Sequence, residues 1–123
     1  MENKSSRTFD LLTLGQVLLR LSPPDNERLS RGDTFVKQVG GAELNVAVGA
    51  SLLGLHTGVI SKLPAHDIGS FMKGKIRSFG VSDDFFMYDH SAGARLGIYY
   101  YENGAYPRKP KVIYDRQHSS FFS

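Results

Sequence analysis

The sequence of 123 residues contains no cysteine, which excludes a disulfide framework and a thiolate metal site and is compatible with a reducing compartment. No apolar run approaches the roughly 20 residues that a bilayer-spanning helix needs. The first residues, Met1 to Arg7, also lack the apolar segment of a signal peptide. We therefore expect a cytoplasmic protein without a membrane partner.

Charge of one sign is not concentrated in any segment. The 15 Lys and Arg residues and the 12 Asp and Glu residues are mixed along the chain, for a net charge of +3. This mixture favours an ordinary solvated surface, so we expect no nucleic-acid partner.

The length and the hydrophobic content of 41% indicate a single domain. The histidines do not occur at metal-ligand spacing, and we assign no metal to His56, His66, His90 and His118.

Three common functional motifs are missing or incomplete. No GxSxG segment is present, which argues against a serine nucleophile on a strand-to-helix turn. The dinucleotide pattern GxGxxG fails because Leu44 replaces its third glycine and Lys62 stands near the place of the ribose-binding acid. Residues 69–75 match the spacing of a phosphate-binding loop. However, Ile76 replaces its Ser or Thr and the segment fits the apolar stripe of a helix, so we interpret the match as accidental.

The most informative feature that is present is the pair Gly40 and Gly41. It stands between a strand-like segment and a helix of small residues that begins near Ala42. Glycine lacks the Cβ that would keep a ligand away from the backbone, and the first N–H groups of the helix would point at the same gap. We expect a polar or anionic small molecule to bind there.

The spacing of apolar residues predicts an α/β fold. Residues 9–14 read as a strand that is buried on both faces in the middle of a sheet. Asp67 is the candidate N-cap of the second helix. The remaining pattern predicts strands over 17–21, 34–39 and 56–62 and helices over 42–54 and 67–79. Successive strand-to-helix units imply parallel strands joined by right-handed crossovers.

The last third of the chain reads as a β-hairpin of strands 96–101 and 111–116. Alternation would put Val112, Tyr114 and Arg116 on one face, so an aromatic ring and a cation project together. A guanidinium in a strand calls for an anionic partner. The tyrosines at 99–101 serve either core packing or an interface. Residues 119–123 close the chain without a turn or a polar tail, and we expect a truncated product.

Five separated segments, in order, resemble the amino-terminal part of the PfkB/ribokinase family of sugar kinases, and within it the kinases of 2-keto-3-deoxygluconate. The matching segments are residues 15–24, 40–47, 62–64, 95–100 and 112–116. The resemblance implies an α/β Rossmann-like core with a small β-sheet lid, whose strands are those near 17–21, 34–39, 96–101 and 111–116. Residues 1–123 would then form the amino-terminal part of one kinase domain, with the ATP-binding half absent.

The resemblance also implies a substrate site. Gly40, Gly41 and Asn45 fall on the family positions that hydrogen-bond sugar hydroxyls. Tyr100, Tyr114 and Arg116 fall on its lid and carboxylate-binding positions. The substrate would be a sugar acid that receives the ATP γ-phosphoryl group on a primary hydroxyl, and an arginine fork suits its carboxylate.

This sequence departs from the family in three places. Gln16 stands where Glu is common, and residues 108–111 replace an Arg-Pro-Ser-Lys segment. Nothing matches the Gly-Ala-Gly-Asp motif that supplies an anion hole and a general base. We therefore expect no catalytic residue in this chain. ATP and Mg²⁺ would act in the complete enzyme, a homo-oligomer through its lid, and would not bind this fragment well.

Two other functions stay open. One is a non-catalytic sugar-binding module. The other is a binder of single-stranded nucleic acid, with the tyrosine strand as a stacking platform and a phosphate track made of Arg108, Lys109, Lys111 and Arg116.

Overall fold

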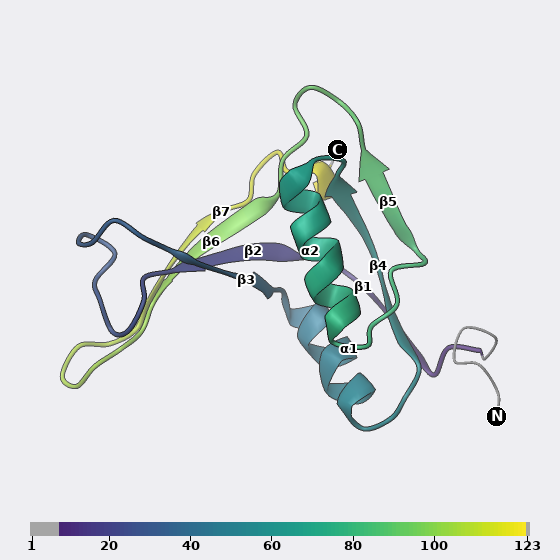
Figure 1. Cartoon of the computed structure of the whole chain (residues 1–123), viewed down its shortest axis with the longest axis horizontal. Coiled ribbons are helices and arrows are strands. Elements are labelled where there is room, and N and C mark those ends of the chain that lie inside the picture. The colour runs from purple at the N-terminus through teal and green to yellow at the C-terminus, as the bar shows by residue number, and fades with distance from the viewer. Residues whose placement is uncertain (1–7, 123) are drawn as a thin grey trace.

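Two separate β-sheets form the protein in the computed structural model, which describes residues 8–122 (Figure 1). The first sheet has three parallel strands in the order β1 (Leu11–Leu14), β4 (Thr57–Pro64) and β5 (Phe86–Asp89). The second, which we call the lid, has the order β3 (Val36–Gly40), β2 (Leu18–Ser22), β6 (Gly97–Glu102) and β7 (Lys111–Asp115). The helices are α1 (Ala42–Leu52) and α2 (Asp67–Ser78), and a 3-10 turn, η2, covers Ser120–Phe122.

The hydrophobic core lies where β4, α1 and α2 meet. Val59 and Leu63 of β4 are fully buried, because this strand has a neighbour on each side. Met72 and Ile76 of α2 are fully buried too, at the i, i+4 spacing that keeps two residues on one helix face. The Thr57 hydroxyl donates a hydrogen bond of 3.0 Å to the Ala47 carbonyl of α1 and so satisfies a buried polar group.

The prediction that the first strand lies mid-sheet is wrong for residues 8–122. There β1 is an edge strand that pairs only with β4. Its residues alternate between half-buried and exposed, and Leu12 and Leu14 are on the exposed face. A run of apolar residues does not say how many neighbours a strand has, since that depends on pairing with distant segments.

The helices begin differently from each other. Gly41 precedes α1 with φ of 125°, and no side chain caps the helix. At α2 the cap is His66, whose Nδ1 accepts from the Gly69 N–H at 3.5 Å, so the prediction of Asp67 as N-cap is wrong. Asp67 is instead the first helical residue. Residues 69–75 lie inside α2, which confirms that their phosphate-loop spacing is accidental.

Strand β5 is absent from the sequence-based prediction. It has four residues and pairs with only one neighbour, β4, so its pattern is too short to separate from a loop. Its presence completes the unit β4–α2–β5, in which two parallel strands are joined by a helix. The expected parallel α/β layer is thereby confirmed.

The lid extends away from the helices as an arm (Figure 1). Its centre is the parallel pair β2 and β6, and β3 and β7 flank them in antiparallel pairing. A strand occurs in each of the four segments expected for the lid, and the β6–β7 hairpin is confirmed. The loops that join β2 to β3 and β6 to β7 lie together at the far end, which we call the lid tip (Figure 1).

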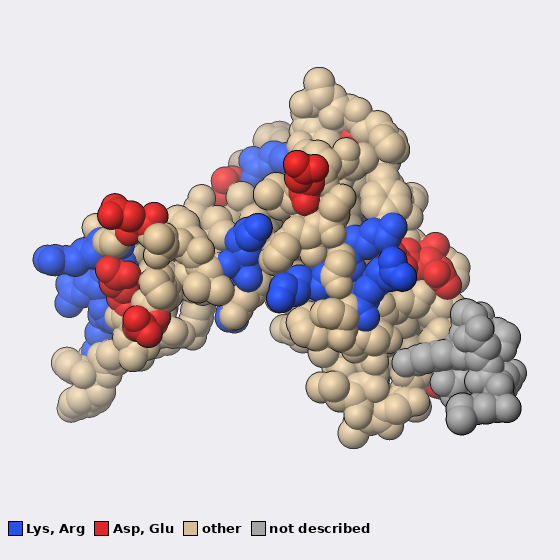
Figure 2. Space-filling view, in the orientation of Figure 1, with Lys and Arg blue, Asp and Glu red and all other residues tan. Residues whose placement is uncertain are grey.

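The surface carries both signs of charge. Basic and acidic side chains are interspersed on the face shown in Figure 2, and both gather at the lid tip. Among residues 8–122, no helix is long and apolar enough to cross a membrane.

Candidate substrate cleft

A cleft of about 840 Å³ opens between one face of the lid and the start of α1. This volume falls in the range of small-molecule sites. The loop after β1, the first turn of α1, β2, β6, β7 and η2 all contribute to it. Its lining residues are Leu14, Gly15, Gln16, Leu18, Arg20, Gly41, Ala42, Glu43, Asn45, Tyr99, Tyr101, Val112, Tyr114, Arg116, Phe121 and Phe122.

The two glycines have different positions. Gly41 lines the cleft, and a Cβ built on it would lie 2.7 Å from the Gln16 carbonyl oxygen. Its positive φ and this close approach both require glycine. Gly40 is buried behind it, where a Cβ would collide with the Tyr99 hydroxyl group. The glycine pair therefore allows the lid tyrosine and the helix start to meet, with only Gly41 on the cleft wall.

The start of α1 offers hydrogen-bond donors to the cleft. The first backbone N–H groups of an α-helix have no intrahelical acceptor, and no side chain caps those of α1. The Asn45 N–H is the first to bond within the helix, to the Gly41 carbonyl at 3.0 Å, and its side chain lines the cleft. The positive end of the helix dipole favours a polar or anionic ligand here.

Three tyrosines cover the lid wall of the cleft. Tyr99 pairs with Tyr114 across β6 and β7, and their ring centroids are 5.8 Å apart. Tyr101 is on the same face because side chains alternate along a strand. The same alternation points Tyr100 to the opposite face, where its ring lies 5.8 Å from that of Phe35. Tyr100, which we expected to face the ligand, thus lies on the other face of the lid, whereas Tyr99 and Tyr101 line the cleft.

Two arginines lie on these rings. The guanidinium of Arg116 is 4.8 Å from the centroid of the Tyr114 ring, and that of Arg20 is 5.5 Å from the Tyr101 ring. Such contacts hold a cation in place without neutralising it. Neither arginine has an ion pair within residues 8–122, and the buried Nε of Arg20 has no hydrogen-bond acceptor there. Arg116 is exposed and follows the last residue of β7, so the cleft presents two available cations.

Two further polar groups shape the opposite wall. The Gln16 amide nitrogen donates to the Ser119 hydroxyl at 2.7 Å, which fixes the side chain that departs from the family pattern. Glu43 is in the first turn of α1 and leaves no room for a Cβ at Gly15, where that atom would lie 2.5 Å from its carboxyl carbon. A carboxylate at this helix start interacts favourably with the dipole and can accept from hydroxyls.

The turn η2 is tied to β5 through Asp89. Its carboxylate accepts from the Ser91 N–H at 3.0 Å and from the Ser120 hydroxyl at 2.8 Å. Hydrogen bonding from the Ser91 side chain, then from the Ser91 N–H and then from the Ser120 hydroxyl, lowers the pKa of Asp89 from 3.8 to about 2. Because Phe121 and Phe122 line the cleft, this attachment helps to hold one of its walls.

Four of the expected site residues come together in the cleft: Gly41, Asn45, Tyr114 and Arg116. Gly40 supports it from behind and Tyr100 faces away. Sequence reasoning missed Tyr99, Tyr101, Arg20 and Glu43 as lining residues. Alternation from Tyr114 would have selected Tyr99 if the pairing of β6 with β7 had been known. No group of three His, Asp or Glu side chains that could hold a metal occurs within residues 8–122.

Comparison with known proteins shows the family to which the chain is similar. The sequence matches the pfkB family of carbohydrate kinases over residues 8–123. The 2-dehydro-3-deoxygalactonokinase of Haloferax volcanii is 41% identical over 109 residues, which are 89% of this chain and 33% of that protein. The 5-dehydro-2-deoxygluconokinase 1 of Bacillus cereus is 34% identical over 80% of this chain and 30% of its own length.

A solved structure gives the same result. The 2-dehydro-3-deoxygluconokinase of Thermotoga maritima is 42% identical and superimposes with a TM-score of 0.85, over 90% of this chain and 33% of that protein. The chain thus spans about a third of the length of these relatives. The expected α/β ribokinase-like core with a β-sheet lid is confirmed. The chain belongs to the pfkB family of carbohydrate kinases.

Proposed function

We propose that the cleft is the sugar-acid site of a kinase that phosphorylates 2-keto-3-deoxygluconate or a close isomer on a primary hydroxyl. The names of the three relatives share one substrate type, a dehydro-deoxy sugar acid. A carboxylate and several hydroxyls are therefore the groups that the cleft would recognise. A cytoplasmic location stays a prediction.

The observation that carries this proposal is Arg116. Its guanidinium lies against the Tyr114 ring, faces the cleft and has no carboxylate partner within residues 8–122. An arginine that is oriented in this way can bind a carboxylate through two parallel hydrogen bonds. Asn45, Gly41 and the first N–H groups of α1 would bind the hydroxyls from the other wall.

We propose that the groups for the phosphoryl-transfer step lie in the part of the relatives that this chain does not span. ATP and Mg²⁺ would bind in that part of the complete enzyme. The residues of this chain would bind and orient the sugar acid, which is the positioning part of such catalysis. We therefore also propose that the 123-residue chain alone forms no ADP from ATP.

Calorimetric titration of the chain with 2-keto-3-deoxygluconate tests the site. Arg116→Lys keeps the charge but loses the two-pronged geometry, and we expect it to weaken binding by about 1 to 3 kcal/mol. Arg77→Lys, on the exposed side of α2, serves as the matched control and leaves binding unchanged. A neutral hexose should show no difference between native chain and Arg116→Lys. Equal loss in both variants would refute the carboxylate role.

The single-strand nucleic-acid alternative requires the tyrosines and the cations to share one face. Strand β7 separates them, because Val112 and Tyr114 line the cleft whereas Lys111 and Ile113 line a different pocket. Of the four cations in the supposed track, only Arg116 lies beside the tyrosines. This separation favours the small-molecule site.

We also propose that the complete protein self-associates through the outer face of the lid. That face carries Phe35, Tyr100 and Ile113, and the first and last of these are about half exposed at 48% and 50%. Tyr99 and Tyr101 face the cleft and so are not part of this outer face. Exposed apolar groups on a sheet with open edges favour association. Ile113→Arg should shift a sedimenting dimer of the complete protein to monomer, whereas Ile68→Arg on α2 should not.

A further inference from the structure

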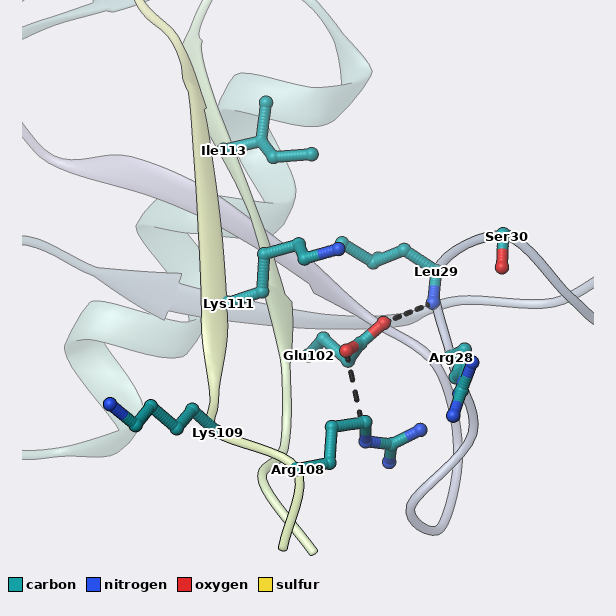
Figure 3. A pocket seen from close by; sticks show the side chains of 8 residues that line it. All are labelled: Arg28, Leu29, Ser30, Glu102, Arg108, Lys109, Lys111 and Ile113. Carbon is teal, nitrogen blue, oxygen red and sulfur yellow. Dashed lines mark hydrogen bonds and ion pairs between the residues drawn. The ribbon is translucent and has the colours of Figure 1, made fainter.

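A second pocket, of about 520 Å³, lies at the lid tip (Figure 3). Its walls are the loop between β2 and β3 and the end of the β6–β7 hairpin, far from α1. The lining residues are Arg28, Leu29, Ser30, Glu102, Arg108, Lys109, Lys111 and Ile113. We call it the tip pocket.

Glu102 ties the two walls of the tip pocket together. It is 3% exposed, and its carboxylate accepts from the Leu29 N–H at 2.7 Å. Its other oxygen lies 3.8 Å from the Nε of Arg108 (Figure 3). A buried carboxylate is stable only when it is paired in this way. Both oxygens of the one carboxylate in the pocket are therefore occupied.

Arg108 adds a second connection between the loops. Its Nη2 donates to the carbonyls of Asn26 and Asn103, on opposite sides of the pocket. The Asn103 side chain in turn donates to the Asp25 carbonyl at 3.4 Å. These bonds hold the walls in position before any ligand arrives, which lowers the ordering cost of binding.

The side-chain groups left over in the tip pocket are donors. Arg28, Lys109 and Lys111 have no ion pair within residues 8–122, and the Ser30 hydroxyl lines the pocket beside them. Lys111 extends across the pocket toward Leu29, and Arg28 lies on the facing loop (Figure 3). The acidic residues of that loop, Asp25, Glu27 and Asp33, are not among the lining residues. The pocket thus has an excess of positive charge and no free carboxylate.

We propose that the tip pocket binds a small phosphate-bearing polyanion, at a site separate from the sugar cleft. Two or more negative charges match the unpaired cations, and phosphate oxygens accept from lysine, arginine and hydroxyl groups at once. The volume suits a small molecule rather than a polymer. The lining includes no aromatic ring on which a base could stack, which disfavours a nucleic acid.

Titration of the 123-residue chain with inorganic pyrophosphate tests the site. We expect saturable binding that weakens about tenfold in Lys111→Met and in Arg28→Met, because each loses one charge-assisted contact. Lys75→Met removes the same charge from exposed α2 and should change binding less than about twofold. Arg28 and Lys111 are both exposed, so we expect the sheets to remain in each variant. Circular dichroism of the variants checks this.

Three results would overturn the proposal. The first is no saturation by about 1 mM pyrophosphate in the native chain. The second is an equal loss in Lys75→Met, which would mean that net charge alone attracts the anion. The third is tighter binding of a single-stranded oligonucleotide than of pyrophosphate at equal salt, which would assign the cations to nucleic acid. Sugar-acid binding in the same samples reports separately on the cleft.

Discussion

Tyr99 and Tyr114 lie directly opposite each other on β6 and β7, with ring centroids 5.8 Å apart and ring planes at 36°. The Arg116 guanidinium lies over this pair, 4.8 Å from the centroid of the Tyr114 ring. The tyrosine pair also covers Gly40, so the glycine pair and the lid meet at one point. The relationship links the aromatic strand to the start of α1 and distinguishes Tyr99 from its neighbour Tyr100.

Replacing these neighbouring tyrosines should have unequal effects on ligand binding. Tyr99→Ala removes the ring that pairs with Tyr114, and we expect it to weaken 2-keto-3-deoxygluconate binding by about 1 kcal/mol. Tyr100→Ala changes only the outer face and should leave the dissociation constant within about twofold. Calorimetric titration of both variants measures the difference. A larger loss in Tyr100→Ala would contradict the observed pairing of β6 with β7.

Alanine substitutions at two glycines should change the free energy of unfolding in opposite directions. Gly41→Ala places a Cβ at a positive φ and 2.7 Å from a backbone oxygen, and should cost about 1 to 3 kcal/mol of stability. Gly49→Ala, inside α1 where the new Cβ would have no atom within 4 Å apart from its own helix backbone, should add about 0.5 to 1 kcal/mol. Urea unfolding followed by circular dichroism gives both values. A stable Gly41→Ala variant would mean that the start of α1 adapts to a side chain.

Two leucines provide a test of where the core lies. Leu63→Ala opens a cavity at a residue with no exposed surface and should lower the free energy of unfolding by about 2 to 5 kcal/mol. Leu53→Ala removes the same atoms from a residue that is 83% exposed and should change it by about 0.5 kcal/mol at most. Thermal unfolding of the two variants checks this order. Similar losses of stability in the two variants would mean that Leu53 makes a stabilising contact outside the core described for residues 8–122.

Acid should weaken the attachment of η2 to β5. The pKa of Asp89 is lowered from 3.8 to about 2 in the folded chain, so folding favours the ionised carboxylate. Its contribution to stability is present above pH 4 and is lost as the pH falls from about 4 to about 2. Asp89→Asn should therefore be less stable than the native chain at pH 7, and the two should converge near pH 2. A difference that persists at pH 2 would assign the effect to packing.

Local pattern was sufficient for the elements that it specifies by itself. The strands of the lid, the two helices and the β6–β7 hairpin follow from apolar spacing and glycine placement within one short segment. The position of Gly41 before a helix likewise predicts a ligand site without knowledge of the fold, and Gly41 lines the cleft. The family resemblance rests on such short segments, and it is confirmed over residues 8–123.

Long-range pairing decided the rest. The choice between Tyr99 and Tyr100 depends on how the hairpin is aligned, and a shift of one residue would reverse their faces. The edge position of β1 depends on its pairing with β4. Arg20, whose Nε has no hydrogen-bond acceptor within residues 8–122, reaches the cleft because β2 lies parallel to β6. The tip pocket exists because Glu102 joins two loops that are far apart in the sequence. Sequence by itself determined which chemical groups this chain carries and which strands and helices hold them. Only the tertiary structure decided which of these groups meet, because strand register and loop contacts are set by residues that are distant along the chain.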